Sequence, residues 1–113
     1  MTRAKDLEKL GALADLMLQH RLGQMRQASA RLDRSRAQMT AIDKAAEPAD
    51  LPEMLAGLVA CDYRRWADVR KAELNTVIAR QTAEAMAARA EAEMAFGRVH
   101  ALRGIAAKLL GKR

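Results

Sequence analysis

The chain has 113 residues and a formal net charge of +6, from 20 lysines and arginines against 14 aspartates and glutamates. Aromatic residues make up only 3%, and alanine is the most frequent residue, so we expect closely packed helices rather than a thick globular core. The single cysteine, Cys61, excludes an internal disulfide and a cysteine-based zinc cluster. The length predicts a single domain over residues 1–113.

No segment has the sequence of a secretory signal or a membrane span. The first ten residues, MTRAKDLEKL, lack the apolar stretch of a signal peptide. The apolar run over residues 55–61 is far shorter than the roughly 20 residues that cross a bilayer. We therefore expect a cytoplasmic protein without a transmembrane segment.

Residues 3–46 are predicted to form one long amphipathic helix. Apolar side chains recur there at steps of three and four, which is the spacing of a coiled-coil stripe. The predicted stripe consists of Leu7, Leu10, Ala14, Met17, Leu18, Leu22, Met25, Ala28, Leu32, Ser35, Met39, Ile42 and Ala46.

A short turn is predicted over residues 47–50, because Pro48 cannot continue a helix. Asp50 then offers an N-cap for a second helix over 51–110. This helix is longer than the first, so its start must overhang, bend near Gly57, or fold back as a separate helix over 51–62. Its predicted stripe includes Leu55, Val59, Trp66, Val69, Met86, Ala90, Met94, Ala101, Ile105 and Leu109.

Two long helices joined by a short turn predict an all-α fold, a two-helix antiparallel coiled-coil hairpin. A lone hairpin buries little apolar surface, so we expect either a homodimer that forms a four-helix bundle or a partner protein that covers one face.

The polar residues do not form a recognisable catalytic or metal-binding motif. Cys61 lies in an apolar run and is predicted to be a packed, inert thiol. His20 and His100 have no carboxylate or second histidine at helical spacing, and are predicted to be solvated. We therefore expect no enzymatic activity, no metal and no cofactor.

Tyr63, Trp66 and Val69 lie near the predicted tip of the hairpin. Two of the three aromatic side chains of the protein are in this group. They either pack against a folded-back 51–60 segment or anchor a partner protein, since tryptophan and tyrosine are enriched at binding hot spots.

The C-terminal segment AFGRVHALRGIAAKLLGKR, residues 95–113, combines an apolar arc with cations and has no acidic side chain. Its arc continues the stripe and predicts pairing with the first helix, while a weakly bound membrane-surface helix is the alternative. Binding to nucleic acid through scattered cations is a further alternative, without sequence specificity.

The segments RAKDLEKLGALADL, DYRRWADVRKAELNTVIARQTAEA and AFGRVHALRGIAAKLLGKR, with a proline-containing break after the first, resemble the FliJ family of flagellar and type III protein export. The best match is the rhythm of Arg98, Ala101, Leu102, Ile105 and Lys108. The alternative is a generic helical-hairpin adaptor.

The resemblance implies a non-enzymatic stalk or chaperone-escort partner of an export ATPase, in the cytoplasm or peripheral at the inner membrane. The basic end would then meet the ATPase, while Tyr63, Trp66 and Val69 would meet the export gate or escort chaperones. The basic end comprises Arg98, Arg103, Lys108, Lys112 and Arg113.

Overall fold

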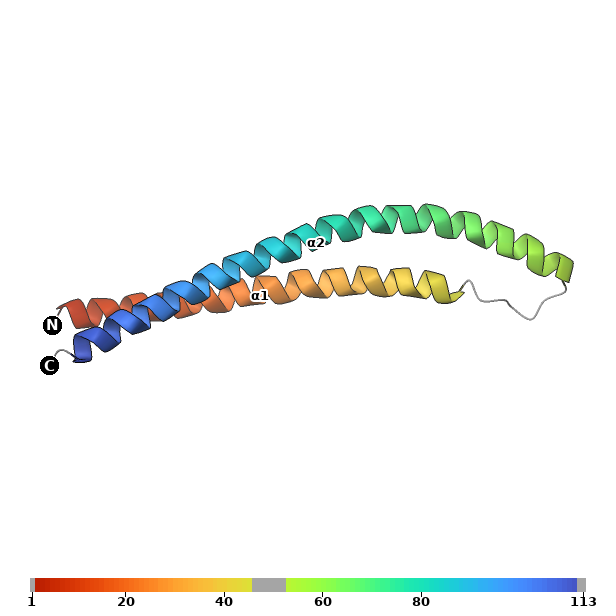
Figure 1. Cartoon of the computed structure of the whole chain (residues 1–113). Coiled ribbons are helices and arrows are strands. Elements are labelled where there is room, and N and C mark those ends of the chain that lie inside the picture. The colour runs from red at the N-terminus through yellow and green to blue at the C-terminus, as the bar shows by residue number, and fades with distance from the viewer. Residues whose placement is uncertain (1, 46–52, 112–113) are drawn as a thin grey trace. The chain divides into compact units, whose positions relative to one another are not determined.

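The computed structural model describes residues 2–45 and 53–111, which form two helices (Figure 1). Helix α1 spans Thr2–Ala45 and helix α2 spans Glu53–Gly111. These bounds differ by only one or two residues from the predicted helices 3–46 and 51–110. The predicted turn at 47–50, with Pro48 and Asp50, lies outside the described residues.

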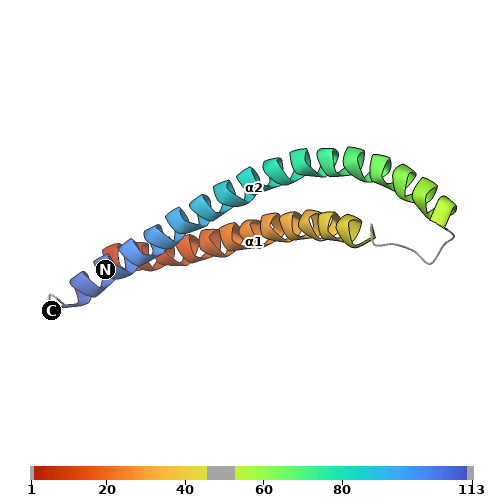
Figure 2. The same cartoon turned by 45° about the vertical axis from the view of Figure 1, so that its right-hand side comes forward.

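The chain divides into two compact units, and each combines a part of α1 with a part of α2. Unit 1 contains residues 1–28 and 84–113, and unit 2 contains residues 29–83. In unit 1 the start of α1 and the end of α2 lie at the same end (Figures 1 and 2).

Polar contacts between the helices fix their direction within each unit. In unit 1, Asp15 pairs with Arg103 at 3.7 Å and Arg21 pairs with Glu91 at 3.8 Å. In unit 2, Arg70 donates to Gln38 at 3.4 Å, while Tyr63 donates to the main-chain carbonyl of Ile42. Higher numbers in α1 meet lower numbers in α2, so the helices are antiparallel, which confirms the predicted all-α hairpin.

The buried stripe of α1 follows an alternating spacing of four and three residues, the spacing of a coiled coil. We call the buried and half-buried positions of this stripe the α1 seam. The predicted stripe is confirmed except at Leu10 and Met17, which are 51% and 41% exposed. Its last member, Ala46, lies outside the described residues. The α1 seam consists of Leu7, Gly11, Ala14, Leu18, Arg21, Met25, Ala28, Leu32, Ser35, Met39 and Ile42.

The predicted stripe of α2 is wrong by one or two residues along most of the helix. Trp66, Val69 and Met94, which the prediction placed inside, are 54%, 62% and 54% exposed. The buried or half-buried residues are instead their C-terminal neighbours Ala67, Arg70 and Ala95, because alanines make up much of the face that α2 turns toward α1. The α2 seam consists of Tyr63, Ala67, Arg70, Leu74, Val77, Gln81, Ala85, Ala88, Ala92, Ala95, Val99, Leu102 and Ala106.

The predicted contact between the C-terminal segment and α1 is formed within unit 1. Val99 is only 4% exposed, and Leu102 and Ala106 are half-buried. The rest of the predicted apolar arc stays partly exposed, since Ile105, Leu109 and Leu110 are 49%, 43% and 68% exposed. The arc is therefore only partly used for pairing of the two helices.

The core of unit 2 is a small apolar cluster at one end of the paired helices. Ile42 from α1 packs with Ala67 and Leu74 from α2. Met39, Tyr63 and Ile78 are partly buried and pack against this cluster. The mixture of small and large residues lets the two backbones approach while each branched side chain fills the space beside an alanine.

The start of α2 extends beyond the end of α1 within unit 2 (Figures 1 and 2). Because α2 is continuous from Glu53, residues 53–62 form its first turns and not a separate helix folded back on it. Gly57 lies inside this helix and causes no interruption. Cys61 is exposed, so the prediction of a packed thiol is wrong, because its apolar neighbours Leu58 and Val59 are themselves exposed rather than packed around it.

Candidate protein-binding surfaces

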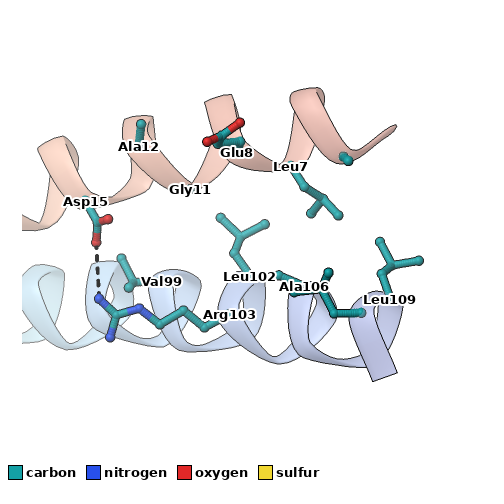
Figure 3. Close-up of a pocket in the computed structure, with 12 residues that line it drawn as sticks. Leu7, Glu8, Gly11, Ala12, Asp15, Val99, Leu102, Arg103, Ala106 and Leu109 are labelled. Atoms are coloured by element: carbon teal, nitrogen blue, oxygen red, sulfur yellow. Dashed lines mark ion pairs between the residues drawn. The ribbon is translucent and has the colours of Figure 1, made fainter. Parts of the chain in front are cut away.

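A groove opens between the helices at the terminal end of unit 1, and we call it the terminal groove (Figure 3). It has a volume of about 660 Å³. Leu7 from α1 and Leu102 from α2 point into the space between the helices. The groove is lined by Ala4, Leu7, Glu8, Gly11, Ala12, Asp15, Val99, Leu102, Arg103, Ala106, Leu109 and Leu110.

Small residues explain why this groove stays open. Gly11 lies in the α1 seam, and no atom of the packed surroundings lies within 4 Å of the position that a β-carbon would take. Ala106 lies in the α2 seam and likewise projects little volume into the space. Protein interiors are packed without gaps of this size, so the two helices leave space here for an apolar side chain of another helix.

An ion pair borders the terminal groove. Asp15 and Arg103 lie on opposite helices, 3.7 Å apart between Oδ1 and Nη2, as the dashed line in Figure 3 shows. Both side chains are more than half exposed, so water screens the pair and its contribution to stability is small. The guanidinium of Arg103 therefore stays accessible to a carboxylate of a partner.

The other residues of the predicted basic end are spread along the last turns of α2. Arg98 and Lys108 are exposed, and Arg98 lines a second groove of about 360 Å³. Lys112 and Arg113 lie outside the described residues. The second groove is otherwise apolar, and its other lining residues are Leu10, Leu13, Ala14, Met17, Ala95, Ala101 and Leu102.

The three predicted tip residues have different environments in unit 2. Tyr63 is half-buried and donates its hydroxyl hydrogen to the carbonyl of Ile42 at 2.7 Å. The Trp66 ring lies 5.5 Å from the Tyr63 ring, with 45° between their planes, and remains 54% exposed. Val69 is 62% exposed. Tyr63 thus holds the two helices together, while Trp66 and Val69 present an apolar surface.

Several large apolar side chains are exposed at the start of α2. Met54 is 84% exposed, and Leu55, Leu58 and Val59 are 53%, 63% and 49% exposed. Together with Trp66 they give this part of unit 2 a large apolar surface, which is typical of a protein-binding site. This segment is not among the binding surfaces predicted from the sequence, although its uninterrupted apolar run was the signal.

An ion pair joins the helices of unit 2 between Lys71 and Asp43. The hydrogen bond to Asp43 raises the pKa of the Lys71 ammonium above its ordinary value of 10.5. Desolvation of the ammonium opposes this effect, and the negative charges of Asp43 and Asp68 add to it.

The two histidines lie on the outside of the hairpin, as predicted. His20 and His100 are both exposed, and the His100 ring stacks on Phe96 with 6.4 Å between the ring centroids. Residues 2–45 and 53–111 contain no group of three or more side chains able to hold a metal ion.

Neither of the two described helices is both long and apolar enough to cross a membrane. Comparison of the chain with protein-family models, with curated proteins and with solved structures finds no match.

Proposed function

We propose that the chain is a non-enzymatic helical hairpin that binds other proteins, and that it serves flagellar or type III protein export as a stalk or chaperone-escort partner of an export ATPase. The terminal groove is the observation that carries the protein-binding part of this proposal. It combines leucine-lined walls with the accessible guanidinium of Arg103. The resemblance of the sequence to the FliJ family supports the export part.

The chemistry of the groove defines the kind of partner. Leu7, Leu102 and Leu109 offer contacts to apolar side chains spaced along one face of a helix. Arg103, together with the nearby exposed Lys108, favours carboxylates at the edge of that face. The proposed ATPase surface is thus an amphipathic helix with an acidic margin.

Affinity purification from a native lysate, with the bound proteins identified, tests the export assignment. We expect recovery of an export-type ATPase, and its loss when Arg103→Glu and Lys108→Glu are combined. The matched control is Lys44→Glu with Arg64→Glu, which gives the same net charge but alters unit 2. Recovery of neither an ATPase nor an export gate would overturn the assignment, and retention by the Arg103/Lys108 variant would exclude the basic end as the contact.

Trp66 and Val69 are proposed to contact the export gate or an escort chaperone. Replacement of an exposed aromatic anchor by alanine typically weakens a protein complex by tenfold or more. We expect Trp66→Ala and Val69→Ala to reduce gate or chaperone binding while ATPase binding is unchanged. Tyr63→Phe is the control, because it keeps the ring next to Trp66.

A membrane surface is the second candidate partner, favoured by the exposure of Ile105, Leu109 and Leu110 beside Lys108. Flotation with anionic vesicles tests it. If membrane binding is the activity, the chain floats with these vesicles and stays behind when Leu102 and Leu109 are changed to glutamine. Absence of flotation by the unmodified chain would remove this candidate.

A further inference from the structure

A second apolar stripe runs beside the seam on both helices of unit 1. On α1, Leu10, Leu13 and Met17 each precede a seam residue by one position, and they are 51%, 55% and 41% exposed. On α2, Met94 and Ile105 also precede seam residues, and are 54% and 49% exposed. Side chains at such positions flank the contact between the two helices.

The second groove shows that these stripes belong to one surface. Its lining includes Leu10, Leu13 and Met17 from α1 and Arg98 and Ala101 from α2. Met94 and Ile105 lie four residues from Arg98 and Ala101 respectively, and therefore on the same stripe of α2. We call this surface, Leu10, Leu13, Met17, Met94, Arg98, Ala101 and Ile105, the lateral face.

The charges along the lateral face have a definite order. Continuing the α2 stripe toward its N-terminus gives Glu91 and Glu84, and continuing it toward its C-terminus gives Lys108. Carboxylates therefore precede Met94, and cations follow it. Glu91 and Arg98 lie three and four residues from Met94 on either side.

This order makes the lateral face complementary to itself in an antiparallel arrangement. In a two-fold symmetric interface, every contact between two different residues occurs twice. If residue i of the first copy contacts residue j of the second, then residue j of the first copy also contacts residue i of the second. With Met94 of both copies at the centre, Glu91 of each copy faces Arg98 of the other. A parallel arrangement would bring like charges together along the stripe, which is unfavourable.

We propose that a second copy of this chain covers the lateral face, so that the two unit 1 hairpins form an antiparallel four-helix bundle. The exposed leucines and methionines of both copies fill its core, and methionine at the centre adapts to the geometry. The Glu91–Arg98 pairs select the direction of the second copy. In the single chain Glu91 also lies 3.8 Å from Arg21, and its side chain remains 50% exposed.

Sedimentation equilibrium of the purified full chain tests the proposal. The unmodified chain is expected to have the mass of two copies at micromolar concentrations. Glu91→Arg and Arg98→Glu each replace two attractive pairs by two repulsive ones, and each should weaken association by about tenfold or more. An equimolar mixture of the two variants should associate again, because every pair in the mixed dimer has opposite charges.

The mixture also separates association from folding. Glu91→Arg also removes the pair with Arg21 inside its own chain. This pair is absent whether the variant is alone or mixed with Arg98→Glu, so recovery of association in the mixture reports on the contacts between the two copies. Glu93→Arg is the matched control, since Glu93 has a 68% exposed side chain and lies outside the lateral face. Circular dichroism checks that every variant keeps its helix content. Leu13→Gln, which changes no charge, should also weaken association.

A single-copy mass at all concentrations overturns the proposal, and the lateral face then belongs to a different protein or to a membrane surface. A two-copy mass that Glu91→Arg and Arg98→Glu leave unchanged also overturns it, as does a mixture that associates no better than its components.

Discussion

The Tyr63 hydroxyl of α2 donates a hydrogen bond of 2.7 Å to the main-chain carbonyl of Ile42 in α1. Ile42 lies in the last turn of the described part of α1. Tyr63 thus binds the end of one helix with a side chain from the other. The Tyr63 ring packs against the Ile42, Ala67 and Leu74 cluster at the same point.

Tyr63→Phe removes this hydrogen bond and keeps the ring. We expect the free energy of unfolding to fall by about 1 kcal/mol, because a partly buried hydrogen bond between the two helices is lost. Urea unfolding followed by circular dichroism measures the change. Thr76→Val serves as a control, since its exposed hydroxyl bonds only within its own helix. Equal stability of Tyr63→Phe and the unmodified chain would show that the carbonyl is satisfied by water.

The stripe of α1 was predictable because leucine and methionine repeat there at one phase. Leu18, Met25, Leu32 and Met39 are seven residues apart, and all are buried or half-buried. The stripe of α2 was not, because alanine occurs at nearly every phase and the larger Met86 and Met94 suggested the wrong one. Large apolar side chains mark the buried face of a helix only when the facing helix has small side chains opposite them. Here the larger side chains of α1 fill the space between the helices.

The candidate surfaces were predictable in composition but not in arrangement. The cations of the C-terminal segment are evident in the sequence, whereas the contact of Arg103 with Asp15 depends on the register between two distant segments. The lateral face was hidden for the same reason. The apolar spacing predicts that Leu10 and Met17 are buried and gives no role to Leu13, and only the observed phase shows that all three remain exposed.

Gly11→Ala is expected to stabilise the chain by about 1 kcal/mol. A helical glycine costs about that much relative to alanine, and a β-carbon at Gly11 meets no packed atom within 4 Å. Ala12→Gly, at the neighbouring exposed position, should lower the free energy of unfolding by a similar amount. Thermal unfolding of both variants measures the two changes in stability. A loss of stability in Gly11→Ala would mean that the terminal groove closes on this position.

Gln81→Leu should also stabilise the chain, by about 1 kcal/mol. Gln81 lies in the α2 seam, and its Oε1 is buried with no hydrogen-bond partner among the described residues. An apolar side chain of similar size removes this unsatisfied acceptor and adds apolar contact. Gln27→Leu at an exposed position of α1 is the control and should change stability by less than about 0.5 kcal/mol. A loss of stability in Gln81→Leu would indicate that a water molecule bonds to the amide.

We expect the free energy of unfolding to fall at alkaline pH because of Lys71. Its hydrogen bond to Asp43 raises the pKa of Lys71 in the folded chain above its ordinary value of 10.5. The folded state then holds the proton more tightly than the unfolded state, so the contribution is complete below pH 10.5 and disappears as the pH rises through the folded-state pKa. Lys71→Gln should remove this part of the decline, and Lys9→Gln, an exposed position in unit 1, should leave it intact. Urea unfolding of the three proteins over this pH range measures the difference, and parallel curves for Lys71→Gln and the unmodified chain would contradict the assignment.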